Sequence, residues 1–104
     1  MLFPRYRDLK RIVDKILKED GEIFNMTVRI ETNRGDATIE LYKDDDGRWH
    51  EEILEDEIGI KQTSRYMSYL SIFDILKWLS QDFPGSRIIV ECINDYSIED
   101  FDLS

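Results

Sequence analysis

The sequence predicts an α+β fold: an antiparallel β-meander sheet of four to five strands with two helices packed on one face, in the order α-β-β-β-(β)-α-β. Two observations lead to this prediction. Apolar residues recur at steps of three and four in two segments, as in amphipathic helices, and at steps of two between them, as in half-buried strands. The length of 104 residues predicts a single domain, residues 1–104.

The most strongly marked helix is expected from Ser71 to Phe83. Ser71 and Asp74 have the spacing of a capping pair, in which the hydroxyl accepts a hydrogen bond from a first-turn N–H. Trp78 lies at the edge of the apolar stripe, and Pro84-Gly85 ends the helix. The stripe itself consists of Ile72, Phe73, Ile75, Leu76, Leu79 and Phe83.

An earlier helix is expected from Tyr6 to Lys18, between Pro4 and Gly21. Residues 1–18 hold six basic and two acidic side chains, a net charge of +4. Because the whole chain carries −9, the remaining residues carry −13. The chain is therefore polarised, with a basic helix followed by an acidic body. The apolar stripe of this helix consists of Tyr6, Leu9, Val13, Ile16 and Leu17.

Between the two helices the apolar period is two, which predicts strands. From Glu22 onward, Phe24, Met26, Val28 and Ile30 form one face, and after a turn at residues 33–36 this face continues with Ala37, Ile39 and Leu41. A second turn, Asp44–Gly47, leads into a third strand from Arg48 to Glu55, with Trp49 and Ile53 on one side and His50 and Leu54 on the other. The solvent face would then carry Thr27, Arg29, Thr38, Glu40 and Tyr42.

Two interpretations are open for Arg65 to Leu70. It is either a fourth antiparallel strand or the beginning of one long helix from Ser64 to Phe83. The strand is favoured because the longer helix would be apolar all round. Arg87 to Ile93 is β-branched and almost continuously apolar, which predicts a well-covered strand. The predicted order ends with that strand.

Composition narrows the class of protein. A hydrophobic fraction of 41% is too high for a disordered chain. No apolar run approaches 18 residues, and the N-terminus lacks the apolar region of a signal peptide. The net charge repels nucleic acid and anionic membranes, so a basic protein is the expected partner, with no direct nucleic-acid or membrane binding. The single cysteine, Cys92, cannot form an internal disulfide, and a cytoplasmic location is expected.

The sequence offers little for catalysis, and no catalytic residue, metal site or cofactor is expected. His50 and Cys92 are the only histidine and cysteine, which is too few ligands for zinc. The run Asp44-Asp45-Asp46-Gly47 suggests a calcium loop, but Tyr42 and Ile53 occupy positions where such a loop needs oxygen ligands. Arg34-Gly35-Asp36 is a tripeptide read by adhesion receptors, yet a hairpin turn needs the same residue types.

The most unusual feature of the sequence is a block with more acidic residues than the rest of the composition leads one to expect. Between Asp44 and Glu57 there are eight acidic residues against one arginine and one histidine. Such charge either protects a sheet edge against aggregation or forms a negative surface that docks on a basic partner. The candidate partner-binding residues, with the two aromatic side chains as anchors, are Tyr42, Asp44, Asp45, Asp46, Trp49, Glu51, Glu52, Glu55, Asp56 and Glu57.

The expected function is that of a small acidic, non-enzymatic protein-binding module. It would act as an inhibitor if its carboxylates mimic phosphates and occupy the nucleic-acid-binding surface of the partner. The alternative is a self-associating structural or regulatory subunit, in which the basic helix of one copy meets the acidic hairpin of another in a homodimer. A third interpretation is an enzyme that uses carboxylates alone.

Overall fold

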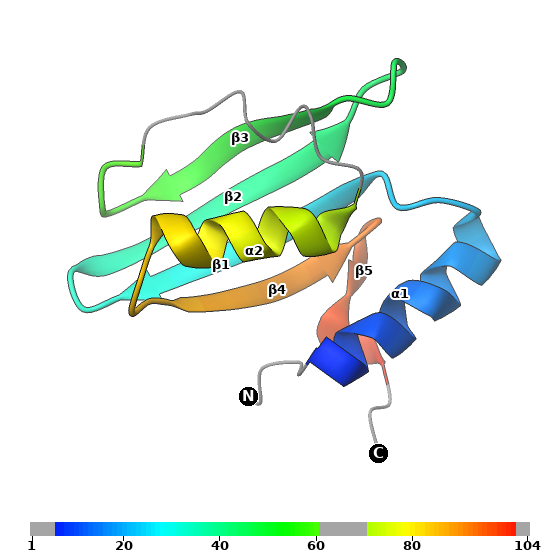
Figure 1. Ribbon diagram of the computed structural model, residues 1–104, viewed down its shortest axis with the longest axis horizontal. Coiled ribbons are helices and arrows are strands. Elements are labelled where there is room, and N and C mark those ends of the chain that lie inside the picture. The colour runs from blue at the N-terminus through cyan, green and yellow to red at the C-terminus, as the bar shows by residue number, and fades with distance from the viewer. Residues whose placement is uncertain (1–5, 61–70, 102–104) are drawn as a thin grey trace.

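The computed structural model describes residues 6–60 and 71–101 and shows two helices on one face of a five-stranded antiparallel sheet (Figure 1). The helices are α1 (Tyr6–Asp20) and α2 (Ile72–Asp82). The predicted α+β fold class is confirmed. The strands are β1 (Asn25–Thr32), β2 (Gly35–Lys43), β3 (Trp49–Asp56), β4 (Arg87–Ile93) and β5 (Tyr96–Ser97), and a short 3₁₀ helix (Ile98–Asp100) follows β5.

The strands lie in the order β3-β2-β1-β4-β5. The first three form the predicted meander, whereas β4, which follows α2 in the chain, pairs with β1 on the far side of the meander (Figure 1). The fifth strand is β5, which the sequence did not indicate. The predicted strand at Arg65–Leu70 lies outside the described residues.

The core lies between the sheet and the two helices, as the apolar stripes predicted. In α1 the stripe differs from the expectation, because Ile12 is buried and Leu17 is 40% exposed. Leu17 lies beyond the edge of the stripe that faces the sheet. No helix in the described part of the chain has both the length and the apolar character needed to cross a membrane. The side chains that meet in the core include Leu9, Ile12, Val13, Ile16, Met26, Val28, Ile30, Ile39, Leu41, Ile72, Ile75 and Leu79.

Helix α2 begins and ends where the sequence predicts. Ser71 is its N-cap, and the hydroxyl Oγ accepts a hydrogen bond from the backbone N–H of Asp74 (3.5 Å). The same hydroxyl donates to the Asp74 carboxylate over 3.4 Å. The Asp74 carboxylate therefore contacts the side chain of Ser71 and not the backbone N–H of Ser71. At the other end, the N–H of Phe83 donates to the Leu79 carbonyl (3.0 Å), and Pro84 follows directly.

A β-bulge at Leu54 changes which side chains of β3 share a face. Ile53 pairs with Ile39 of β2, but Glu55 pairs with the preceding residue, Thr38, so Leu54 is an extra residue. Glu55 therefore lies on the face of the sheet away from the helices, which we call the open face. Continuing the alternation predicted for this strand would place Glu55 on the face of Trp49 and Ile53, and that prediction is wrong because strict alternation does not hold across a bulge.

A second bulge, at Glu91, has the same effect on β4. Val90 pairs with Val28 of β1, but Cys92 pairs with the preceding residue, Thr27. Cys92 therefore lies half-buried on the open face, whereas strict alternation along the strand would place it on the same face as Val90, and that expectation is wrong.

The turn between β4 and β5 consists of Asn94 and Asp95. Their φ angles are +50° and +69°, the left-handed region that the tightest hairpin turns require at both central residues. Asparagine and aspartate adopt this region more readily than other residues with a side chain. The Asn-Asp pair after a buried strand is thus the local signal for the hairpin that sequence reasoning missed.

Candidate partner-binding surface

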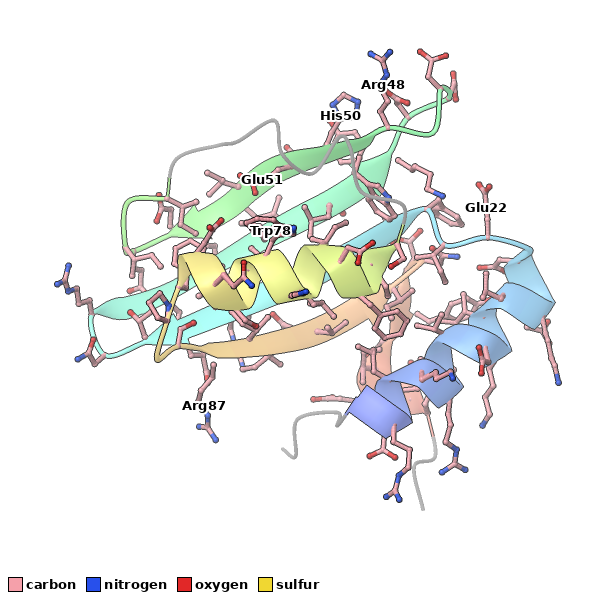
Figure 2. The ribbon with its side chains drawn as sticks, in the orientation of Figure 1. Glu22, Arg48, His50, Glu51, Trp78 and Arg87 are labelled. Carbon is pink, nitrogen blue, oxygen red and sulfur yellow. The ribbon has the colours of Figure 1, made fainter. Side chains whose placement is uncertain are left out.

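The candidate surface is built on residues 42–57, which we call the acidic hairpin. It comprises the end of β2, a tight turn, and β3, the last strand at one side of the sheet. Figure 2 shows Arg48 and His50 at the turn, projecting beyond the edge of the sheet. The ten candidate side chains fall into four groups according to what they contact.

Asp44 organises the turn of the acidic hairpin. Its Oδ1 accepts hydrogen bonds from the backbone N–H groups of Asp46 and Arg48, both at 2.9 Å. Its Oδ2 lies 2.6 Å from Nε2 of His50, whose ring stacks on Tyr42 with centroids 5.4 Å apart. The hydrogen bond from His50, followed by that from the Arg48 N–H, lowers the pKa of Asp44 below its ordinary value of 3.8. This carboxylate stabilises the turn.

Asp56 and Glu57 close the opposite end of the hairpin. The Asp56 carboxylate accepts three backbone hydrogen bonds, from residues 58, 59 and 60, at 3.0, 2.7 and 2.9 Å. Oε1 of Glu57 accepts from the N–H of Asp36 (2.9 Å). A Cβ atom at Gly35 would lie 2.8 Å from Cβ of Glu57, so glycine is required for this close approach. The hydrogen bonds of these two carboxylates stabilise the folded chain.

Trp49 and Glu51 lie on the helix-facing side of β3. Trp49 is only 1% exposed and belongs to the core, and the ammonium of Lys43 lies 5.5 Å from its ring centroid. Glu51 is half-buried opposite Leu41 of β2. In this conformation the Trp49 indole is not available as an anchor for a partner.

Seven of the candidates are exposed, and Asp56 and Glu57 among them accept the backbone hydrogen bonds given above. The other five accept none from the described residues: Tyr42, Asp45, Asp46, Glu52 and Glu55. Glu40 of β2 belongs with them, because it is directly opposite Glu52 in the sheet register. We call these six residues the acidic face. In residues 6–60 and 71–101, its five carboxylates form neither salt bridges nor hydrogen bonds. The sequence predicted Glu40 on the solvent face but not as part of the candidate site. Counting residues outward from the Asp44–Gly47 turn along both strands would have paired Glu40 with Glu52.

The pairing of Glu40 with Glu52 is unfavourable for the fold. Directly opposite residues in an antiparallel pair have Cβ atoms about 5 Å apart, and like charges there are destabilising. On the neighbouring strand β1 the open face carries charges of both signs, since Arg29 forms a salt bridge with Glu31 (3.4 Å). The excess negative charge is therefore concentrated on β2 and β3.

The basic side chains of α1 lie on the other side of the molecule from the acidic face. The helix packs against the helix-facing side of the sheet, whereas Glu40, Glu52 and Glu55 belong to the open face. Five basic residues of α1 are exposed: Arg7, Lys10, Arg11, Lys15 and Lys18. A partner on the acidic face would thus not meet the positive charge of α1.

The only histidine and the only cysteine, which would have to meet to form a His-assisted nucleophile, lie far apart. His50 is on β3 and Cys92 on β4, with β2 and β1 between them, so three strand spacings, about 14 Å, separate their strands. Burial, and after it the carboxylates of Glu91, Asp95 and Asp100, raises the pKa of the Cys92 thiol, which keeps it protonated. Among the residues described, no three His, Cys, Asp or Glu side chains are grouped so that they could hold a metal ion.

The fold and the site define the class of this protein as an α+β domain with a half-covered antiparallel sheet and an acidic open face. Comparisons of the chain with protein-family models, with curated proteins and with solved structures find no match.

Proposed function

We propose that the protein is a small non-catalytic binding module that docks its acidic face on the basic surface of a protein partner. One observation carries the proposal, the pairing of Glu40 with Glu52 across β2 and β3. Asp44, Asp56 and Glu57 contribute hydrogen bonds to the fold, but this pair contributes none and adds repulsion. A guanidinium or ammonium group of a partner would relieve that repulsion.

The neighbours of the pair extend the same surface along the hairpin. Glu55 lies on the open face at one end because of the Leu54 bulge, and Asp45 and Asp46 lie at the turn. Tyr42 is 38% exposed and stacked on His50. It supplies a rigid aromatic side chain between the glutamates of the strands and the aspartates of the turn. The result is a row of carboxylates with one aromatic contact, which suits a surface rich in lysine and arginine.

The proposed activity is inhibition of a protein that handles nucleic acid. A row of carboxylates along two strands presents negative charge to a groove that otherwise holds phosphates. Electrostatic attraction between the acidic face and the groove would accelerate association, and salt would weaken it. Binding that is strong at low salt and lost at high salt is the expected signature.

The test compares capture of partners from host lysate by three tagged proteins at low and high salt. The first is the natural sequence, and the second is the triple variant Glu40→Gln, Glu52→Gln, Glu55→Gln. The third, the control, removes three exposed charges outside the acidic face: Asp14→Asn, Glu19→Gln and Glu99→Gln. A basic protein captured by the natural sequence and by the control, but not by the triple variant, supports the proposal.

Two outcomes would contradict it. Capture of the same proteins by the triple variant in the same salt would show that the acidic face is not the binding surface. Light-scattering masses close to that of a dimer, abolished by the triple variant, together with no captured partner, would instead indicate that the acidic face joins two copies of this chain.

A further inference from the structure

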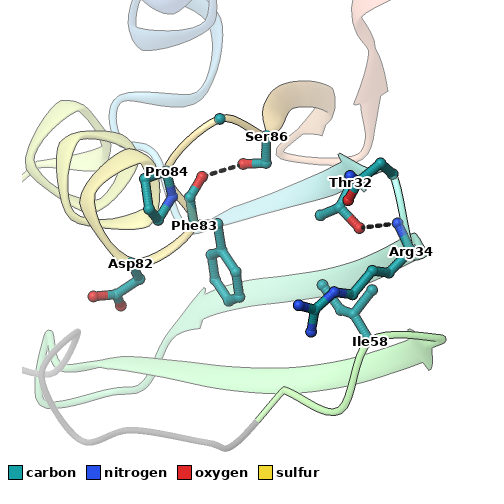
Figure 3. A pocket seen from close by; sticks show the side chains of 9 residues that line it. Thr32, Arg34, Ile58, Asp82, Phe83, Pro84 and Ser86 are labelled. Atoms are coloured by element: carbon teal, nitrogen blue, oxygen red, sulfur yellow. Dashed lines mark hydrogen bonds between the residues drawn. The ribbon is translucent and has the colours of Figure 1, made fainter.

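A cleft of about 510 Å³ lies at the end of the sheet remote from the acidic turn (Figure 3). One wall is the turn between β1 and β2, and the other is the chain segment that ends α2. Its volume is within the range of small-molecule sites, about 300 to 1,000 Å³. The residues that line it include Thr32, Arg34, Ile58, Phe83, Pro84 and Ser86.

Hydrogen bonds within the β1–β2 turn fix the backbone of Arg34 at the mouth of this cleft. Oγ1 of Thr32 accepts a hydrogen bond from the Arg34 N–H (3.1 Å) and donates one to the Gly35 carbonyl (2.7 Å). The backbone is thus fixed while the guanidinium is exposed and forms no salt bridge in the part of the chain that the structure describes. Figure 3 shows the Arg34 side chain extending from the turn toward Phe83.

The facing wall is apolar and also fixed. Phe83, the C-cap of α2, is half-buried, and its carbonyl accepts hydrogen bonds from both the N–H and the hydroxyl of Ser86. Pro84 adds a rigid ring, and Ile58 supplies an aliphatic side chain from the segment after β3. The cleft therefore places the Arg34 guanidinium, which forms no salt bridge with the described residues, beside an apolar wall.

These groups define the chemistry of a ligand. The planar guanidinium of arginine matches a carboxylate in two parallel hydrogen bonds, and the apolar wall favours a hydrocarbon group attached to it. The C-terminal end of α2, which carries the negative end of the helix dipole, lines the cleft and disfavours a second negative charge, as on phosphate. We infer that this cleft binds a monocarboxylate that carries an apolar group of about the size of a phenyl ring, with Arg34 holding the carboxylate.

Two sources can supply this chemistry: a free small carboxylic acid, or the C-terminal carboxylate of a polypeptide whose last residue is apolar. The test follows the amide and methyl NMR signals of the isotope-labelled protein during titration with 3-phenylpropionate and with an acetylated dipeptide ending in phenylalanine. The corresponding uncharged amides and inorganic phosphate are the ligand controls. Arg34→Gln removes the guanidinium, and Arg48→Gln, an exposed arginine in the turn at the other end of β2, is the matched control.

The expected result is saturable shifts at Phe83, Ile58 and the Arg34 side chain, weakened about tenfold or more by Arg34→Gln and unchanged by Arg48→Gln. The uncharged amides and inorganic phosphate should also bind at least about tenfold more weakly than the two carboxylates. Tighter binding of the dipeptide would identify a polypeptide C-terminus as the source, and equal or weaker binding a small acid. Shifts that do not saturate, that persist in Arg34→Gln or that phosphate reproduces would overturn the inference. Because Arg34 is not part of the acidic face, this outcome is independent of the proposed function.

Discussion

The side-chain oxygen of Asn94 accepts a hydrogen bond from the backbone N–H of Phe24 over 2.7 Å, which ties the β4–β5 turn to the start of β1. The same oxygen also accepts from the N–H of Asn25 (3.2 Å). The Asn94 amide nitrogen donates to the Glu22 carbonyl (2.7 Å) and to the Asp20 carboxylate (3.1 Å) at the end of α1. One buried side chain therefore joins α1, β1 and the last hairpin.

Replacing Asn94 by alanine should destabilise the protein by about 2 to 4 kcal/mol. The change leaves several partly buried polar groups without partners and puts a Cβ-bearing residue that tolerates positive φ poorly at φ +50°. Urea unfolding measures the loss. Asn94→Gly, which accepts that φ, should lose about 1 kcal/mol less, whereas Asp95→Asn, in the same turn but exposed, should change stability by under about 0.5 kcal/mol. An Asn94→Ala protein as stable as the natural one would contradict the prediction.

The turn of the acidic hairpin should loosen in acid because of Asp44. A carboxyl group whose pKa is lowered by folding stabilises the folded state above its ordinary pKa of 3.8, and this contribution disappears as the pH falls through the lowered value. The natural protein should therefore be more stable than Asp44→Asn at neutral pH, and the difference should shrink below pH 3.8. Urea midpoints at a series of pH values measure it.

Asp45→Asn is the control for this experiment, since the exposed Asp45 carboxylate forms no hydrogen bond within the described residues. Its difference from the natural protein should not follow the same pH dependence. A stability gap for Asp44→Asn that stays constant or grows toward acid pH would show that the hydrogen bond from His50 does not hold the turn.

The two tryptophans should differ in fluorescence. Trp49 is 1% exposed, whereas Trp78 on α2 is 37% exposed. In Trp78→Phe only Trp49 emits, at shorter wavelength and with little quenching by acrylamide, while Trp49→Phe should emit at longer wavelength and be quenched readily. Trp49→Ala should also cost about 3 to 5 kcal/mol by leaving a cavity. Equal quenching of the two single-tryptophan proteins would mean that Trp49 is exposed in solution.

The repulsion between Glu40 and Glu52 should be visible as stability gained by removing it. Glu52→Lys places opposite charges across β2 and β3 and should stabilise the protein by about 0.2 to 1 kcal/mol, less at high salt. Glu55→Gln is the matched control, because Glu55 is opposite Thr38 and has no such repulsion to relieve. A destabilised Glu52→Lys protein with intact secondary structure would argue that the pair is not strained.

Local patterns in the sequence predicted the elements, because each depends on neighbours along the chain. The Ser71 cap and the apolar stripe determine α2, and alternation determines β1 and β2. The bulge at Leu54 was not predictable in this way, since it arises from pairing with another strand and leaves no mark on the alternation itself. The same holds for the position of β4 beside β1, which depends on tertiary packing.

The sequence predicted that the candidate site is acidic, but not which of its residues are free to bind a partner. Counting acids identified the hairpin, yet the sequence does not show which carboxylates bind backbone N–H groups, as Asp44 and Asp56 do. Trp49 was expected at the surface, although burial of a residue next to a turn depends on packing from elements far along the chain. Asn94 was missed because its partners are more than 60 residues away in sequence.

The pairing of β1 with β4 determines when the sheet can be completed during synthesis. Met26 pairs with Ile93, so the central strand β1 lacks one neighbour until residues 87–93 have left the ribosome. The meander of β1, β2 and β3 needs only local contacts and can assemble earlier. During that interval β1 presents an apolar strand with an unpaired edge, the kind of edge that joins chains together. The nascent chain is thus expected to be most prone to aggregation in the interval before β4 emerges.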